Sequence, residues 1–473
     1  MKTYSLYING EWKETIDSID VYNPANDEPV GRVSMGTTKD ALAAVDAASL
    51  AYSEWSSKTA IERSVYLKRW YEEIEKEKLE LAKILTLEQG KPLKEAIGEI
   101  EYANSFILWY AEEAKRVYGD IVPALQQDKR ILVRKQPVGV VAAITPWNFP
   151  AAMITRKVAP ALAAGCTVVI KPSELTPLTA YFLAELADKA GIPPGVINIV
   201  TGNPVDIGDV WLSDKRVRKV TFTGSTKVGK YLMSKSSETV KKVSLELGGH
   251  APFIVLNDAD INHAVDSLIK AKFRNGGQTC VCPNRIYLQS GIVSDFIKKL
   301  KEATSSLVVG NGMDEGVDIG PLINDNATQK VLTHVQDASE KGAQVLWDQS
   351  NSHISNRFIK PIILVDVTEN MLCMKEETFG PLAPISTFDS IEEVIKYANN
   401  SDYGLAAYIF TTSLEHSFRL SEALEYGIVG VNDPLPSVAQ APFGGMKESG
   451  LGREGGYQGI EEFLETQYIS FKL

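Results

Sequence analysis

The sequence is poor in the residues that build metal clusters and disulfide scaffolds. Its 473 residues include four cysteines and five histidines. Such a small, scattered set of cysteines argues against a secreted fold held together by disulfides. A reducing compartment is therefore expected, and we predict a cytoplasmic protein.

Long apolar runs and dense basic clusters are also missing. The longest nearly apolar run, Ala159 to Ile170, is about half of what a membrane span requires. The first residues, MKTYSLYINGEWKET, lack the apolar stretch of a signal peptide. The net charge is −11, with no Lys/Arg run to offset it, which argues against a nucleic-acid binder. We therefore expect no nucleic-acid partner and no membrane partner.

Apolar runs of β type alternate with helical segments over most of the chain. The length predicts more than one domain, and residues 38–119 carry a mainly helical pattern. From residue 138 the runs VGVVAAI, TVVIKP, INIVTG, KVTFTG and KVSLEL are separated by helix-like segments. This alternation predicts a doubly wound α/β domain with a parallel sheet, whose ligands bind beyond the carboxyl ends of the strands.

A second set of alternating segments follows ELGGHAP. It includes APFIVL, NRIYLQ, FIKPIILVDV, AAYIFTT and YGIVGVN, and it predicts a second α/β domain. The segment before residue 138 reads as a hairpin around a polar turn. The last residues, ending in ETQYISFKL, alternate and predict an edge strand.

Two of the four cysteines lie one residue apart in FRNGGQTCVCPNR, residues 273–285. Zinc sites space paired cysteines two to four residues apart and need further ligands, so we expect no metal here. A Cys-x-x-Cys redox motif is absent too. What remains is a nucleophilic thiol or two buried small residues. The flanking Gly276 and Gly277 are able to bring the backbone close to a ligand.

A thiol nucleophile needs a base and a donor for the oxyanion. Glu246 follows an apolar strand in LELGG and is a plausible base. Asn148, in TPWNFP, follows the strand VGVVAAI at the end where active sites of such sheets gather. Each signal is weak alone, because a glutamate in this position is more often an ion-pair or surface residue.

Seven motifs together carry a resemblance. TPWNFP, KPSE, FTGST, LELGG, GQTC, EETFGP and PFGGMKESGLGRE resemble the motifs of the NAD(P)-dependent aldehyde dehydrogenase family, in order, over essentially the whole chain. The resemblance implies a cofactor domain of residues 1–118 and 139–249 and a catalytic domain of residues 250–442. It also implies a bridging element of residues 119–138 and 457–473 that pairs subunits in a homodimer or homotetramer.

The same resemblance implies roles for the candidate catalytic residues. Cys280 matches a thiol that attacks the aldehyde as a thiolate. The Asn148 amide and the Cys280 N–H would hold the oxyanion, and Glu246 would activate the water that hydrolyses the thioester. Lys157 matches a lysine near that base, with a structural ion pair as an equal alternative.

The cofactor site lacks the Gly-x-Gly-x-x-Gly fingerprint. The resemblance instead implies contacts to the pyrophosphate, the two riboses and the nicotinamide from Thr145, Trp147, Lys171, Ser173, Glu174, Gly224, Ser225, Glu377 and Phe379. Glu174 suits a ribose 2′-hydroxyl and would repel a 2′-phosphate. Lys171 and Ser173 would instead suit a 2′-phosphate. We therefore favour NAD and leave NADP open.

Two arginines near the candidate catalytic residues bear on the substrate. Arg156 and Arg274 suit an anionic group at the far end of the substrate, unless both serve structural salt bridges. FRNGGQTCVC and MITRK resemble the succinate-semialdehyde dehydrogenase group, in which the matching positions Arg156, Arg274 and Ser437 would hold the carboxylate. Pro434 and Pro436 depart from that group and are able to reshape the pocket.

Several alternatives in substrate and in function stay open. Glutarate semialdehyde, sulfolactaldehyde and lactaldehyde stay open as substrates, as does a catalytically silent structural member of the family. A CoA-acylating enzyme is disfavoured, because Glu246 supplies a base for hydrolysis. Cys282 is either a packing residue or the partner of Cys280 in a reversible disulfide, whose strain would make it easily reduced.

Overall fold

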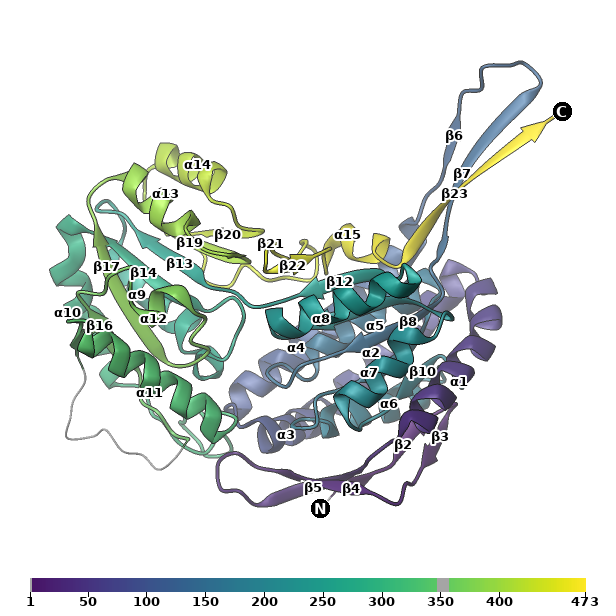
Figure 1. The fold of residues 1–473 in the computed structure, drawn as a ribbon, viewed down its shortest axis with the longest axis horizontal. Coiled ribbons are helices and arrows are strands. Elements are labelled where there is room, and N and C mark those ends of the chain that lie inside the picture. Colours follow the sequence, from purple (N-terminus) through teal and green to yellow (C-terminus); the bar gives the residue numbers. More distant parts are fainter. Residues whose placement is uncertain (1, 347–356) are drawn as a thin grey trace.

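The protein is built on two large sheets and a thin arm that projects from one side (Figure 1). The structure is a computed structural model, and it describes residues 2–346 and 357–473. The predicted α/β class with two sets of strands is confirmed. Across the described residues, no helix combines the length and the apolar character that crossing a membrane requires.

The first large sheet has eight strands in the order β22-β12-β11-β8-β9-β10-β2-β3. The strands β8 to β12 are mutually parallel, whereas β2, β3 and β22 pair antiparallel. The strands are β2 (Leu6–Ile8), β3 (Glu11–Lys13), β8 (Val140–Ile144), β9 (Thr167–Lys171), β10 (Ile197–Ile199), β11 (Val217–Thr223), β12 (Lys242–Glu246) and β22 (Gly450–Leu451). The strand order reverses between β8 and β11, and ligands of doubly wound sheets bind at such a point.

Helices cover both faces of this sheet. One face carries α2 (Ala60–Lys76), α3 (Lys78–Gln89), α4 (Leu93–Glu113), α5 (Ala152–Ala164) and α6 (Leu178–Lys189), and the other carries α1 (Thr38–Ser57), α7 (Pro204–Ser213) and α8 (Thr226–Ser236). Val141 and Ala143 of β8 pack into the first core, and Val140 and Ala142 pack into the second. Because alternate residues of a strand face opposite sides, a continuous apolar run is what a sheet buried on both faces requires.

The second large sheet has seven strands in the order β15-β16-β17-β14-β13-β19-β20. Its strands are β13 (Ala251–Val255), β14 (Pro283–Gln289), β15 (Gln344–Val345), β16 (Ile362–Val365), β17 (Leu382–Phe388), β19 (Ala406–Phe410) and β20 (Ile428–Val431), all parallel to their neighbours except β15. The helices α9 (Ile261–Lys272) and α10 (Val293–Ser305) cover one face; α11 (Asp325–Glu340), α12 (Leu372–Lys375), α13 (Ile391–Asn399) and α14 (Leu414–Ala423) cover the other.

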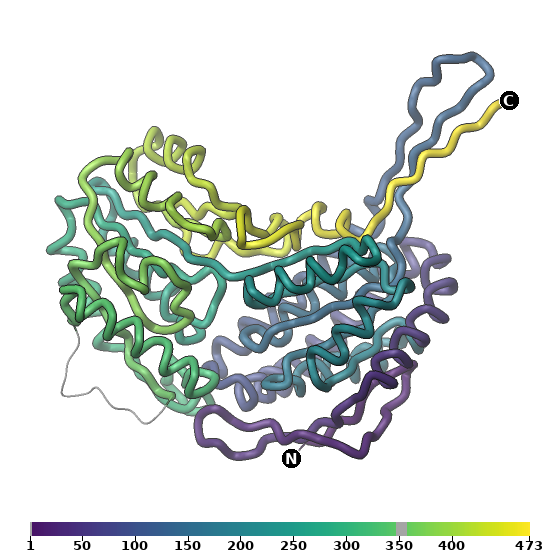
Figure 2. The backbone as a smooth tube through the Cα atoms, in the orientation of Figure 1, coloured from purple at the N-terminus to yellow at the C-terminus, as the bar shows by residue number. Residues whose placement is uncertain are grey.

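The arm consists of β6 (Asp120–Val122), β7 (Lys129–Pro137) and β23 (Leu464–Lys472). The predicted hairpin is β6 and β7, and the predicted edge strand β23 pairs antiparallel with β7 from Leu464 opposite Pro137 to Lys472 opposite Lys129. The strands β7 and β23 extend side by side from the body of the protein (Figure 2). Ile121, Leu125 and Phe471 of the arm expose apolar side chains in the single chain.

The remaining elements are short. They are β1 (Lys2–Tyr4), β4 (Ser18–Tyr22), β5 (Pro29–Ser34), β18 (Tyr403–Gly404), β21 (Met446–Lys447), α15 (Gly456–Glu461) and the 3₁₀ turns η1 (Ala114–Arg116), η2 (Ser237–Thr239), η3 (Arg274–Gly277) and η4 (Ser290–Ile292). The chain returns to the first sheet at β22, after the end of the predicted catalytic domain at residue 442. The domain boundaries themselves stay a prediction.

Candidate active site

Two cavities meet at Cys280. The larger, of about 360 Å³, is lined by Pro146, Trp147, Asn148, Thr223, Gly224, Ser225, Leu247, Gly248, Cys280, Asn326, Ala327, Lys330, Glu377, Thr378 and Phe379. The smaller, of about 180 Å³, is lined by Tyr102, Phe149, Met153, Arg156, Arg274, Thr279, Cys280, Val281, Leu435, Ser437 and Phe443. The larger cavity lies where β8 and β11 end, at the reversal of strand order. A thiol shared by two cavities is accessible from both.

A tight turn presents the Cys280 thiol. The N–H of Cys282 donates to the Thr279 carbonyl at 3.1 Å, which puts Cys280 in the middle of the turn. A Cβ at Gly249 would lie 2.0 Å from the Cys280 carbonyl oxygen, so only glycine permits this approach. Gly277, with φ +78°, abuts the backbone of Gly380, where a Cβ would lie 2.2 Å from the carbonyl oxygen. The close approach expected at the glycine pair is therefore to the protein backbone, and neither cavity includes that pair.

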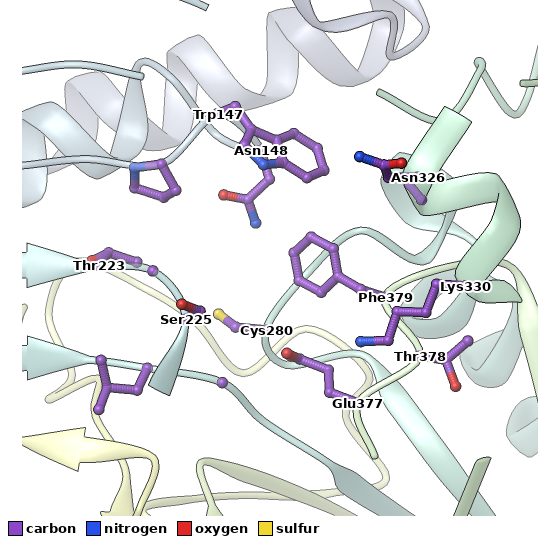
Figure 3. A pocket seen from close by; sticks show the side chains of 15 residues that line it. Trp147, Asn148, Thr223, Ser225, Cys280, Asn326, Lys330, Glu377, Thr378 and Phe379 are labelled. Atoms are coloured by element: carbon purple, nitrogen blue, oxygen red, sulfur yellow. The ribbon is translucent and has the colours of Figure 1, made fainter. Parts of the chain in front are cut away.

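Asn148 is fixed through its backbone and its amide. Its carbonyl accepts hydrogen bonds from Lys91 Nζ at 2.8 Å and from Asn275 Nδ2 at 3.0 Å. Its Nδ2 donates to the Gln278 carbonyl at 3.1 Å, and its buried Oδ1 has no partner within the described residues. The Asn148 side chain projects toward Cys280 from the opposite wall of the larger cavity (Figure 3). An amide donor and the thiol therefore face the same space.

Burial disfavours the thiolate. It raises the pKa of the Cys280 thiol to about 12, although Arg156 and Arg274 draw that pKa downward and Glu377 and Glu246 push it upward. The thiol is consequently protonated at neutral pH in this state. A thiol is the weaker nucleophile, so reaction requires the proton to leave.

Glu246 belongs to a buried cluster of charges beside the cavities. Glu454 pairs with Arg156 at 2.6 Å and with Lys157, and Lys157 Nζ donates to Thr223 Oγ1 at 2.6 Å. Burial opposes ionisation of Glu454, but Lys157 and Arg156 hold its pKa below the ordinary value. Burial, together with the charge of Glu454, raises the pKa of Glu246 well above the ordinary value. The side chain of Glu246 lines neither cavity, and its Oε2 has no partner within the described residues.

Five of the nine predicted cofactor residues line the larger cavity: Trp147, Gly224, Ser225, Glu377 and Phe379. The rings of Trp147 and Phe379 meet edge to face, with centroids 5.6 Å apart. Burial raises the pKa of Glu377 to about 7, while the N–H of Gly249 donates to its Oε1 at 3.0 Å. Figure 3 shows Glu377 and Phe379 on the wall opposite Ser225.

The other four lie outside the walls of this cavity. Thr145 receives no hydrogen bond at its buried Oγ1 within the described residues, and its N–H donates to the Lys171 carbonyl at 3.1 Å. Lys171 forms an ion pair with Glu174, and Ser173 Oγ accepts from the N–H of Leu175 at 3.3 Å. Thr145 follows β8, Lys171 is the last residue of β9, and Ser173 and Glu174 follow β9, at the ends that neighbour the cavity.

This arrangement fits a nicotinamide dinucleotide. The helix α8 begins at its N-cap Ser225 on the cavity wall, and the N-terminus of a helix is favourable for a pyrophosphate. Trp147, Leu247 and Phe379 give the cavity an apolar lining, and Glu377 adds a carboxylate able to accept from ribose hydroxyls. The orphaned Thr145 hydroxyl is a further polar group at the same edge of the sheet.

The smaller cavity brings the three predicted substrate residues together. Arg156, Arg274 and Ser437 all line it, but the two arginines differ. Arg156 is buried, pairs with Glu454 and stacks on Phe443 at 3.9 Å. Arg274 lies 5.5 Å from the Phe149 ring and forms no ion pair with any carboxylate of the described chain.

Cys282 points away from both cavities. Its thiol is fully buried and accepts a hydrogen bond from Lys272 Nζ at 3.2 Å. Lys272 also donates to Asn284 Oδ1 at 3.0 Å. Burial raises the pKa of Cys282, and Lys272 offsets part of that rise. Both cysteines are free thiols.

Some residues of the site are not predicted by the sequence. Glu454 lies within the quoted motif PFGGMKESGLGRE, yet nothing in the motif indicates that it pairs with Arg156. Lys91, which holds Asn148 and forms an ion pair with Glu99 at 2.5 Å, comes from a helical region without a motif. Lys330 and Tyr102 line the cavities from α11 and α4. Only the fold brings these positions to the site.

Comparison with known proteins shows the family. Residues 12–469 match the aldehyde dehydrogenase family, and the chain belongs to that family. It is 53% identical to the NADP-dependent succinate-semialdehyde dehydrogenase GabD of Escherichia coli, over 98% of this chain and 97% of the relative. It is 52% identical to a glutarate-semialdehyde dehydrogenase of Pseudomonas putida, over 98% and 96%. The crystal structure of a succinate-semialdehyde dehydrogenase from Burkholderia pseudomallei superposes with a TM-score of 0.98 at 49% identity, covering 99% of this chain and 98% of that one.

Proposed function

We propose that this protein oxidises a short anionic aldehyde, foremost succinate semialdehyde, to the carboxylate, with a nicotinamide dinucleotide as hydride acceptor. The observation that carries the substrate class is Arg274, a guanidinium beside Cys280 that forms no ion pair with a carboxylate of the described chain. An uncharged substrate would desolvate this cation without a partner, which is costly. A carboxylate accepts charge-assisted hydrogen bonds from it.

The chemistry runs through Cys280. Its thiolate attacks the aldehyde carbon, and the Asn148 amide and the Cys280 N–H stabilise the oxyanion that forms. No hydrogen bond from that N–H occurs within the part of the chain that the structure describes, so it is free to donate. A bound nicotinamide would accept a hydride from the carbon attached to Cys280, and the thiohemiacetal on this residue would thereby become a thioester.

Glu246 then removes a proton from the water that hydrolyses the thioester. A carboxyl group with a raised pKa is a stronger base once ionised, which suits this role near neutral pH. Lys157 acts on the site through Glu454, because its ammonium group pairs with that carboxylate. Lys157 is therefore proposed as a positioning residue.

The proposed cofactor is NAD. Glu174 is an acceptor for a ribose 2′-hydroxyl, and its ion pair with Lys171 leaves that cation less available for a 2′-phosphate. NADP is the alternative that the named relative from Escherichia coli suggests. The ratio of kcat/KM for the two cofactors distinguishes them.

The proposed localisation, oligomeric state and domain division are those that the sequence predicts. We propose a cytosolic homodimer or homotetramer, since the arm exposes Ile121, Leu125 and Phe471 in the single chain and apolar patches of this kind mark interaction surfaces. The division into a cofactor domain, a catalytic domain at residues 250–442 and a bridging element is proposed with it.

A kcat/KM panel tests the substrate class. It compares succinate semialdehyde, glutarate semialdehyde and a sulfonated aldehyde with a neutral analogue. In this analogue an isopropyl group replaces the carboxylate of succinate semialdehyde. We expect the anionic substrates to be favoured by about two orders of magnitude, the effect of one charge-assisted pair. Equal kcat/KM for the isopropyl analogue would contradict the proposal.

A further inference from the structure

The smaller cavity offers less positive charge than its two arginines suggest. The charge of Arg156 is paired with Glu454 and its guanidinium packs on Phe443, although its Nε and Nη2 have no hydrogen-bond partner within the described residues. Arg274 is the cation of this cavity that forms no ion pair with a described carboxylate, although its charge lowers the pKa of nearby Glu95. A substrate carboxylate has about four acceptor positions on its two oxygens. Donors other than Arg274 are therefore needed to satisfy it.

Tyr102 is a candidate for such a donor. It lines the smaller cavity from α4, a helix that carries none of the predicted site residues. Its hydroxyl oxygen is buried and has no hydrogen-bond partner within the described residues. Its ring meets Phe106 edge to face at 5.0 Å, which fixes the ring plane. Buried tyrosine hydroxyls are normally hydrogen-bonded, so this one lacks a partner that a ligand is able to supply.

The hydroxyl lies among the charged groups of the same cavity. Burial raises the pKa of Tyr102, while Arg156 and Arg274 lower it and Glu454 and Cys280 raise it. The group therefore stays a neutral O–H at physiological pH and retains its proton for donation. Arg274 follows α9, and Ser437 lies in the loop after β20. Together with Tyr102 they put three donors around the cavity from three separate elements.

We propose that the Tyr102 hydroxyl donates a hydrogen bond to the far-end carboxylate of the substrate, alongside Arg274, and thereby selects anionic aldehydes. The inference rests on the proposed function and names a specificity residue for it. Selection arises because a neutral aldehyde leaves the buried hydroxyl unpaired, whereas a carboxylate satisfies it.

The test compares Tyr102→Phe with Tyr110→Phe. Tyr110 lies on the same helix, and its buried hydroxyl likewise has no hydrogen-bond partner within the described residues, but it packs against Gly459 and lines neither cavity. We expect Tyr102→Phe to raise KM for succinate semialdehyde about tenfold or more with kcat nearly unchanged, the pattern of lost uniform binding. KM for the isopropyl analogue should stay the same. Tyr110→Phe should leave both constants unchanged.

Binding of the product succinate, measured by calorimetry on the wild-type protein and both variants, gives a readout that does not depend on turnover. We expect a matching loss of affinity in Tyr102→Phe alone. The inference would be overturned if Tyr102→Phe kept the wild-type KM and the wild-type affinity for succinate. It would also be overturned if KM rose equally for the isopropyl analogue, because the ring of Tyr102 would then act through packing and not through its hydroxyl. A wild-type enzyme that does not distinguish the two aldehydes would instead overturn the proposed function.

Discussion

Arg156 and Glu454 form a buried ion pair, with the guanidinium Nη2 2.6 Å from the carboxylate Oε2. Lys157, the next residue of α5, contacts the same carboxylate. The two charges pair without a substrate, although Arg156 Nε and Nη2 have no hydrogen-bond partner of good geometry within the described residues. Arg274, by contrast, forms no ion pair with a described carboxylate. Two arginines that the sequence presents as equivalent anchors are therefore expected to respond differently to mutation.

Replacing each arginine by glutamine separates binding from stability. Arg274→Gln should raise KM for succinate semialdehyde about a hundredfold and leave thermal unfolding near the wild-type temperature, because a charge-assisted pair is lost. Arg156→Gln should lower the free energy of unfolding by about 3 kcal/mol, because Glu454 loses a buried partner. Kinetics and urea unfolding measure the two effects. A stable Arg156→Gln variant that lost only its preference for anionic aldehydes would contradict this division.

The reactivity of Cys280 should depend steeply on pH. Burial raises its pKa to about 12, so the thiolate fraction increases as pH rises, and alkylation without cofactor should accelerate about tenfold per pH unit between pH 6 and 9. Iodoacetamide labelling followed by mass spectrometry measures the rate at Cys280. Cys280→Ala should show no labelling at this position and no activity. A plateau below pH 8 would mean that the thiol already ionises near neutrality.

Glu246→Gln should separate the two halves of the reaction. Cys280 still acquires the acyl group, so a burst of reduced cofactor close to one per site is expected. Steady-state turnover should then fall by about a hundredfold to ten-thousandfold, the usual contribution of a general base. Rapid-mixing absorbance measurements resolve the burst. Its absence would place Glu246 before hydride transfer.

Cys282 should confer reversible sensitivity to peroxide if it forms a disulfide with Cys280. Inactivation of the wild-type enzyme should then be reversed by dithiothreitol, and Cys282→Ala should lose this reversibility. The bridge requires Cys282 to leave its contact with Lys272, at 3.2 Å. Cys166→Ala, which alters a buried thiol outside this loop, serves as the control. Equal reversibility in Cys282→Ala would contradict the switch.

The sequence predicted most of the fold because its signals are local. Continuous runs such as VGVVAAI and TVVIKP mark strands buried on both faces, and they became β8 and β9. The short motifs predicted which residues gather at the site, and Asn148, Ser225, Glu377 and Cys280 do line one cavity.

Pairing between distant residues was not predictable in this way. Nothing near Arg156 in the sequence indicates that Glu454 neutralises it, or that Lys91 holds the Asn148 carbonyl. Nor does the sequence distinguish Tyr102 from the other residues of its long helix, and only the structure shows that it lines the smaller cavity.

The sequence by itself thus determined the α/β architecture and the family, and it predicted the nucleophile, since strand patterns and motif residues are properties of short segments. Only the tertiary structure decided which charges are satisfied within the protein and which remain for a ligand. That distinction depends on contacts between segments far apart in the chain, in a buried region where every unpaired charge or hydroxyl carries a cost.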